Sequence, residues 1–319
     1  MLTGAIHARE WGGSEICVYF AADILEAYTS KTGLRYGKKY FNADQVRSVV
    51  EDLRLILFPV VNPDGRHYSQ TADPLWRRNR NPAESEGDPN CIGVDLNRNY
   101  DFLWDFPNLF SHKAYVHTST DPCDENQTYR GSAPFSEPET KNVKWLLDNY
   151  QQIRWYIDLH SYGEQILHCW GDDENQSIDA IMNFINASYN SVRGEEEDED
   201  YKEYIPNADL TTAVSLAKSI RDGIKSVREV EYVVKSSYYL YPTSGVGDDY
   251  AYSRHFSDPN SGKIFAYTIE WGKEFHPPWN EMEKIVIDIS AGLLDFCLAA
   301  AAETKNNNNK DSSRNLIWI

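Results

Sequence analysis

The sequence is poor in cysteine, in positive charge and in long apolar runs, and each shortage argues against a class of protein. Its five cysteines include no Cys-x-x-Cys pair, so a zinc site built from cysteines is not expected. Only 31 basic residues face 49 acidic ones, giving a net charge of -18, whereas nucleic-acid binding needs a basic surface. No run of eighteen or more apolar residues exists, so no membrane span is expected. The segment after Met1 shows no signal peptide.

What is present fits one globular domain. The chain has 319 residues, 41% hydrophobic and 25% charged, which is enough for a single α/β domain with a large core. We expect residues 1–303 to form this domain and residues 304–319, which contain a run of asparagines, to form a polar tail. The acidic stretch Glu195–Glu203 is expected to be a solvated, mobile loop.

Hydrophobic periodicity predicts an alternation of strands and helices. The predicted strands cover residues 53–61, 154–160 and 263–270, and the predicted helices cover residues 12–30, 136–150, 178–192, 210–227 and 279–302. Asn62–Gly65 is expected to form a turn after the first strand, and Ser136 with Glu139 a capping box for the second helix. Alternation of this kind predicts a largely parallel sheet covered by helices on both faces.

A metal site is the main functional hypothesis. His7 and Glu10 lie three residues apart, and imidazole with carboxylate is typical of a catalytic zinc that keeps one position open for water. The best third ligand is His160, where an apolar strand ends and thus reaches the carboxyl edge of the sheet. A short motif of this kind also occurs by chance. The remaining histidines lie outside any ligand-spaced cluster and are not nominated: His67, His112, His117, His168, His255 and His276.

A His/Glu/His zinc with an open position activates water and polarises a carbonyl, which is the chemistry of amide hydrolysis. Such a site also needs a base. Glu270, at the carboxyl end of the strand 263–270, is the candidate, because apolar surroundings raise the basicity of a carboxylate. The alternative for Glu270 alone is a surface acid at a strand end.

Seven segments in order resemble the zinc metallocarboxypeptidases of the pancreatic carboxypeptidase A/B type, and the resemblance covers residues 1 to roughly 300. These segments are His7-Ala8-Arg9-Glu10-Trp11, Asn62-Pro63-Asp64-Gly65, Trp76-Arg77-Arg78-Asn79-Arg80, Val94-Asp95-Leu96-Asn97-Arg98-Asn99, His160-Ser161-Tyr162, Tyr241 with Ser244-Gly245, and Thr268-Ile269-Glu270. The resemblance implies that the chain removes C-terminal residues from peptides.

The resemblance also implies roles for single residues. His7, Glu10 and His160 would bind one zinc ion per chain. Glu270 would act as general base, and Arg80 would stabilise the developing oxyanion.

Substrate-binding residues follow from the same resemblance. Asn97 and Arg98 would clamp the terminal carboxylate of the substrate, and Tyr241 would close over it. Arg9 and Arg77 would line adjacent subsites, whereas Arg78 is expected in surface ion pairs.

Specificity would depend on Asp248, which falls where B-type enzymes have an acid. A buried carboxylate at this position would select C-terminal Lys or Arg. Val246 stands where the family has a small glycine, which predicts a pocket that is narrower or of mixed character. Cys91 and Cys123 fall where the family has a disulfide, which indicates an oxidising compartment and a secreted protein.

The family has a leading helix and strands that this sequence does not show before His7, so we expect a mixed, mostly parallel, carboxypeptidase-like sheet that lacks those strands. Two alternatives remain: a zinc amidase acting on cell-wall peptides or acylated amino acids, and an inactive binding homologue. The expected partners are peptide or protein C-termini, with no nucleic acid, and the chain is expected to be a monomer.

Overall fold

A six-stranded sheet forms the centre of the computed structural model, which describes residues 1–196 and 199–314, the stretch 306–314 by its backbone alone. The strand order is β4-β1-β5-β10-β6-β9. The strands are β1 (Leu2–Gly4), β4 (Leu57–Phe58), β5 (Trp155–His160), β6 (Gln165–His168), β9 (Val233–Ser236) and β10 (Phe265–Glu270). Neighbouring strands are parallel except for β6 and β10. The predicted α/β class with a mixed, mostly parallel sheet is therefore confirmed.

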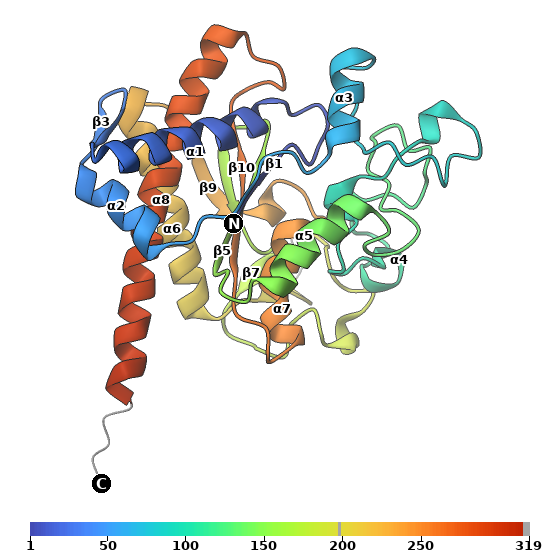
Figure 1. Ribbon diagram of the computed structural model, residues 1–319. Helices are drawn as coiled ribbons and strands as arrows, with labels where there is room; N and C mark the ends of the chain where they lie inside the picture. The colour runs from blue at the N-terminus through green and yellow to red at the C-terminus, as the bar shows by residue number, and fades with distance from the viewer. Residues whose placement is uncertain (197–198, 315–319) are drawn as a thin grey trace.

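Helices cover both faces of this sheet (Figure 1). The helices are α1 (Gly12–Ser30), α2 (Ala43–Asp52), α3 (Pro63–Thr71), α4 (Phe106–Leu109), α5 (Pro138–Asn149), α6 (Asn207–Arg228), α7 (Gly247–Ser257) and α8 (Trp279–Arg314). One buried cluster joins α1, α6 and α8 to the sheet, and a second joins α5 and α7 to it. Because both faces are covered, β5 is buried along nearly its whole length. Two small ribbons pair β2 (Leu34–Tyr36) with β3 (Lys39–Phe41), and β7 (Asn175–Gln176) with β8 (Glu203–Tyr204).

Helix α8 is longer than predicted, since it continues past residue 302 to Arg314. Its segment Trp279–Lys305 is long enough to cross a membrane and contains an apolar window of 18 residues with a mean hydropathy of 2.0. However, 72% of that apolar window is buried inside the structure, as in the core helix of a soluble protein. The helix is thus only weak evidence for a membrane span. Of the predicted tail, residues 315–319 lie outside the described part of the chain.

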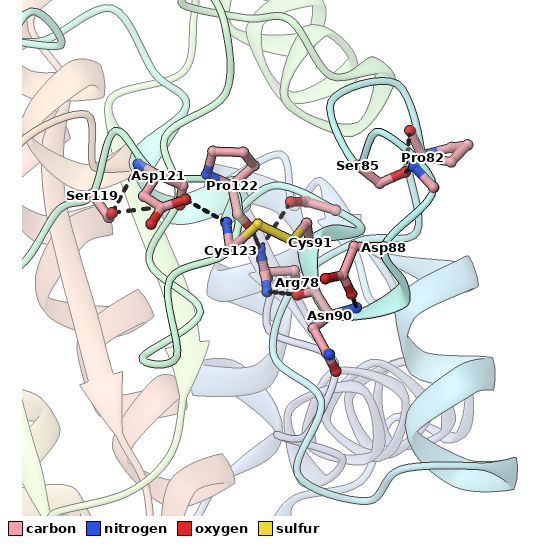
Figure 2. Close-up of a disulfide and its surroundings, with 12 residues drawn as sticks. Arg78, Pro82, Ser85, Asp88, Asn90, Cys91, Ser119, Asp121, Pro122 and Cys123 are labelled. Carbon is pink, nitrogen blue, oxygen red and sulfur yellow. Dashed lines mark hydrogen bonds between the residues drawn. A yellow bond between two sulfur atoms is a disulfide. The ribbon is translucent and has the colours of Figure 1, made fainter.

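A disulfide joins Cys91 to Cys123 and closes a loop with a sequence separation of 32 (Figure 2). The buried guanidinium of Arg78 lies beside this bond and donates hydrogen bonds to Pro122 O at 2.5 Å and Asn90 O at 2.8 Å, one on each side of it. The prediction of surface ion pairs for Arg78 is therefore wrong. Its fork of donors instead satisfies backbone carbonyls that the loop leaves inside the protein.

Residues 178–192 do not form the predicted helix. Side-chain oxygens of this segment accept hydrogen bonds from backbone N–H groups two residues ahead: Asp179 from Ile181, Asn183 from Ile185, and Asn186 from Ser188. Such local bonds offer the backbone an alternative to the helix ladder. The apolar spacing of isoleucines therefore misled the prediction, and Ile178 is 96% exposed.

Two further predictions of local structure are wrong. Asn62–Gly65 begins helix α3 rather than a turn, because the Asn62 side chain accepts the backbone N–H of Gly65 as a helix cap and Pro63 fits the first helical turn. Ser136 and Glu139 make no capping box: α5 begins at Pro138, and the Glu139 carboxylate instead accepts a hydrogen bond from Asn79.

The acidic stretch 195–203 only partly fits the expectation of a solvated loop. Residues 197–198 lie outside the described residues. Glu203, in contrast, is fully buried in β8, where it accepts hydrogen bonds from the Tyr201 hydroxyl at 2.5 Å and from Phe184 N at 3.0 Å. Burial and the neighbouring Asp172 raise the pKa of Glu203 well above its usual value. The end of the acidic stretch is therefore part of the core.

The tight contact of Gly223 in α6 with Gly292 in α8 predicts that a larger side chain at Gly223 lowers the stability of the fold. A Cβ added at Gly223 would lie 2.8 Å from the Cα of Gly292 and 2.9 Å from Ala291 O. Alanine favours a helix over glycine by about 1 kcal/mol, but overpacking costs about 1–3 kcal/mol, so we expect Gly223→Ala to lower the free energy of unfolding by about 1 kcal/mol. Denaturant unfolding measures it. Lys218→Ala, at an exposed position of α6, is the control and should change stability by less than about 0.5 kcal/mol. Equal stability of both variants would contradict the prediction.

Candidate active site

The carboxyl ends of three parallel strands bring the predicted metal ligands together. Strand β1 pairs Gly4 with Leu159 of β5, and β5 pairs His160 with Glu270 of β10. Helix α1 begins directly against these strands, since a Cβ on Gly13 would lie 2.9 Å from Leu159 O. The short connection between β1 and α1, which carries His7 and Glu10, is therefore held over the end of β5.

His7, Glu10 and His160 are all buried, and one ligand atom from each lies within 4.8 Å of the others. The Nδ1 atoms of the two histidines are 3.1 Å apart. Glu10 Oε1 lies 2.8 Å from His7 Nδ1, and Glu10 Oε2 lies 3.2 Å from His160 Nδ1. Two imidazole nitrogens and a carboxylate directed at one point fit a zinc ion with an open position.

Two aspartates orient the histidines from behind. His160 Nε2 lies 2.9 Å from Asp158 Oδ2, and His7 Nε2 lies 3.2 Å from Asp95 Oδ1. Thr3 Oγ1 donates to the other oxygen of Asp158 at 2.6 Å. A carboxylate on Nε2 holds the proton on that nitrogen and leaves Nδ1 free to bind a metal, which is the usual second layer of a zinc site. The donor set therefore fits zinc at both levels.

Neither aspartate was predicted from the sequence, although the position of each next to a predicted site residue indicated it. Asp158 stands two residues before His160 in a strand, so both side chains point to the same face. Asp95 directly precedes the Leu96-Asn97-Arg98 segment. Burial alone would raise the pKa of Asp95, but Arg77 and His7 outweigh burial and hold it well below its usual value.

A cavity of about 280 Å³ opens beside the three ligands. The predicted residues that line it are Arg9, Arg77, Asn97, Arg98, Tyr241, Asp248 and Glu270. A larger cavity of about 520 Å³ lies at the opposite edge of the sheet, where its lining includes Met1, Trp155 and Phe296 but no histidine. The chemistry of the lining therefore assigns the smaller cavity as the candidate active site.

Glu270 stands at the end of β10, next to His160 across the strand pair. Burial raises the pKa of Glu270 to about 8, and the Glu10 carboxylate adds to the increase, whereas His160 and Arg77 oppose it. A carboxylate with so high a pKa is a stronger base than one in water, as proton transfer near neutral pH requires.

The structure does not bring Arg80 to this cavity. Its guanidinium stacks 3.7 Å from the centre of the Tyr68 ring and 4.5 Å from that of Trp76. Arg77 lines the cavity instead, and its Nε donates to Asp95 Oδ2 at 2.9 Å. Between the two arginines, the backbone N–H of Asn79 donates a hydrogen bond to Val94 O. Arg77, and not Arg80, therefore lines the candidate site.

The predicted carboxylate clamp is fixed by hydrogen bonds of its own. Asn97 Oδ1 accepts Gly247 N at 2.9 Å. Arg98 donates from Nε to His117 O at 2.5 Å and from Nη1 to Asn97 O at 2.6 Å. Gly245 approaches so closely that a Cβ would lie 2.2 Å from Arg98 O. The segment that follows Tyr241 therefore packs directly on the clamp.

Asp248 lies at the wall of the cavity and is buried. Its Oδ2 accepts hydrogen bonds from Thr268 Oγ1 at 3.1 Å and Ser237 Oγ at 3.3 Å, and its Oδ1 accepts Asp249 N at 3.0 Å. Burial raises the pKa of Asp248 despite these donors. Val246 lines the same cavity.

Comparisons with known proteins agree with this geometry. The family model described as zinc carboxypeptidase matches residues 1–288. Metallocarboxypeptidase A of Trichophyton tonsurans is 36% identical over 174 residues, which are 53% of this chain and 34% of that protein. Carboxypeptidase O of Bos taurus is 34% identical over 173 residues, 54% of this chain and 39% of that protein. The chain thus spans well under half the length of these curated relatives. A third relative, from Talaromyces stipitatus, is named an inactive metallocarboxypeptidase and is 33% identical over 173 residues, 53% of this chain and 25% of that protein.

Solved structures show the same fold. Carboxypeptidase A from Helicoverpa armigera superposes with a TM-score of 0.68 at 23% identity, covering 96% of this chain and 61% of that one. Bovine thrombin-activatable fibrinolysis inhibitor, in complex with a tick carboxypeptidase inhibitor, superposes with a TM-score of 0.67 at 21% identity, covering 95% and 82%.

The aspartate behind His160 predicts an effect on metal affinity. We expect Asp158→Asn to weaken zinc binding about 10- to 100-fold, because the amide no longer stabilises the proton on His160 Nε2. Competition with a chromogenic chelator measures the affinity. Asp288→Asn is the matched control, since Asp288 is buried in α8 beside Arg228 and outside the cavity. An equal loss of affinity in both variants would show that the effect is one of general stability.

Proposed function

Because the chain belongs to the zinc carboxypeptidase family, we propose that it is a zinc-dependent exopeptidase that removes C-terminal residues from peptides. One observation carries the proposal: the buried donor atoms of His7, Glu10 and His160 lie within 4.8 Å of one another, and Glu270 and Arg98 line the same cavity. This arrangement combines a metal site with a binding site for a carboxylate, which an exopeptidase needs and an endopeptidase does not.

His7, Glu10 and His160 would hold one zinc ion per chain. When bound, the zinc supplies a Lewis acid for the scissile carbonyl and for water. Glu270 would take a proton from the attacking water and later pass it to the leaving amine, a role supported by its raised pKa.

Two cationic groups would act on the substrate at different points. We assign to Arg77, rather than to Arg80, the stabilisation of negative charge on the carbonyl oxygen, because Arg77 lines the cavity and its position is fixed by Asp95. Arg98 with Asn97 would bind the terminal carboxylate, for which a planar guanidinium offers parallel hydrogen bonds. Tyr241 would close over the bound end, and Arg9 would line an outer subsite.

Asp248 supports a preference for C-terminal Lys or Arg. Its carboxylate is buried at the cavity wall, and among the described residues it accepts hydrogen bonds from hydroxyl and backbone groups rather than from a cation. A basic side chain would supply that cation, and an apolar one would leave the charge unpaired.

The proposal extends to the setting of the enzyme. The Cys91–Cys123 disulfide supports an oxidising, extracellular compartment. Residues 1–303 would form the catalytic domain, and residues 304–319 a polar tail. Peptide or protein C-termini would be the partners of a monomeric enzyme.

Release of C-terminal residues tests the proposal directly. Zinc-loaded protein should release the last residue from a peptide with a free carboxylate and leave the C-terminally amidated peptide intact. A chelator should abolish the release, and zinc should restore it. A chain that binds zinc and peptide without releasing any residue would instead be a binding homologue, and cleavage of the amidated peptide or of acylated amino acids alone would favour an amidase.

Replacement of the base gives a second prediction. Glu270→Gln should lower kcat about 10²- to 10⁴-fold, because the amide cannot accept a proton. Zinc content should stay unchanged, as Glu270 is not among the ligands. Glu274→Gln, at an exposed position of the following loop, is the control and should keep full activity. A Glu270→Gln variant with wild-type kcat would remove Glu270 from the mechanism.

The preference for basic residues gives a third prediction. Asp248→Asn should lower kcat/KM for a peptide ending in Lys by at least about 30-fold, because the substrate ammonium would be buried without its partner. The same variant should improve hydrolysis of a peptide ending in Phe. Asp249→Asn is the matched control, because Asp249 is equally buried but accepts Gly171 N and does not line the cavity. Unchanged discrimination between Lys and Phe would contradict a specificity role for Asp248.

A further inference from the structure

His117 contacts the residue proposed to close over the substrate. Its imidazole stacks on the ring of Tyr241, with ring centres 4.2 Å apart and planes 25° from parallel. Tyr115 packs edge to face against the same imidazole, with ring centres 4.9 Å apart and planes at 87°. His117 is half-buried and belongs to the loop closed by the Cys91–Cys123 disulfide.

The backbone of His117 joins the cap to the clamp. Its N–H donates to Pro242 O at 2.9 Å, directly after Tyr241, and its carbonyl accepts Arg98 Nε at 2.5 Å. The next residue continues the contact, because the Ser244 hydroxyl donates to Thr118 Oγ1 at 3.2 Å. One short segment therefore touches both groups that would enclose the terminal carboxylate of a substrate.

Charges around His117 favour its neutral form. Burial lowers its pKa, and the guanidinium groups of Arg98 and Arg77 lower it further. A neutral imidazole can lie flat on a phenol ring, whereas a protonated one would add a third positive charge beside two arginines. The stack on Tyr241 therefore fits the local charge distribution.

We propose that His117 is a positioning residue, which acts through Tyr241: its ring holds the cap in place above Arg98 before a peptide arrives. The inference rests on the function proposed for this cavity. A side chain that is already ordered loses less rotational freedom when a ligand binds, so the benefit falls on binding rather than on chemistry. The recognised group is the free carboxylate at the end of a peptide.

The inference predicts a loss of affinity that depends on Tyr241. In the zinc-loaded Glu270→Gln protein, His117→Ala should weaken binding of a peptide ending in a free Lys carboxylate about twofold to tenfold, the range expected for one lost aromatic pair. His117→Phe keeps a flat ring and should restore most of the affinity. The C-terminally amidated peptide serves as a reference, and its weak binding should not change. Calorimetric titration measures both peptides.

A double-mutant cycle separates positioning from stability. In the Tyr241→Ala background, His117→Ala should have no further effect on affinity. His112→Ala, at an exposed position of the same loop, is the control and should bind as the parent does. Active protein should also show a raised KM with an unchanged kcat for His117→Ala. Undiminished loss in the Tyr241→Ala background, or a His117→Phe variant as weak as His117→Ala, would overturn the inference.

The readout does not depend on catalysis. Protein that binds the free-carboxylate peptide but never hydrolyses it would refute the proposed exopeptidase and still test His117. Protein that shows no preference for the free carboxylate over the amide would refute the clamp, and the inference with it. The His117 ring protons give an independent measure, because they should lose the ring-current shift from Tyr241 in the Tyr241→Ala variant.

Discussion

The parallel pairing of β5 with β1 on one side and β10 on the other is the constraint on which the site depends. In this register His160 and Glu270 leave the sheet as direct neighbours, and the end of β1 leads straight to His7 and Glu10. A shift of one residue would turn each side chain to the opposite face. Register is secured by burial, because helices cover both faces and a slipped strand would exchange every residue it presents to the two cores.

Around this edge the protein compensates buried charge with buried charge. Asp95 is shared between Arg77 and His7, and Asp158 between His160 and the hydroxyl of Thr3. Each ionised group in such a place is costly unless it is paired, so the network is stable only when its members are present together. Asp95, which lies against the predicted metal ligand His7, thus also fixes Arg77 at the cavity. The proposed roles of metal binding and substrate activation would therefore share Asp95 as a support.

The fold class and the clustering of His7, Glu10 and His160 could be predicted from the sequence because both rest on local signals. An apolar strand that ends in histidine and a His-x-x-Glu motif are readable within a few residues, and His160 and Glu10 lie as predicted relative to each other. The sequence predicted Arg80 at the cavity, whereas the structure places Arg77 there. Both arginines lie in one arginine-rich segment, and only the path of the backbone decides which of them faces the cavity. His117 was passed over because its partner Tyr241 is distant in the sequence. Contacts of that kind follow from tertiary packing, which periodicity does not encode.

The Cys91–Cys123 disulfide ties several residues of the candidate active site into one covalent ring. The clamp residues Asn97 and Arg98 and the cap contact at His117 all lie within the covalently closed ring, whereas His7, Glu10, His160 and Glu270 lie outside it on the sheet and its edge. The same ring also carries Asp95, which lies 3.2 Å from His7, whereas Asp248, proposed to select the terminal residue, lies outside it. The covalent ring thus couples the residues proposed to recognise a peptide end to a support of the predicted metal site.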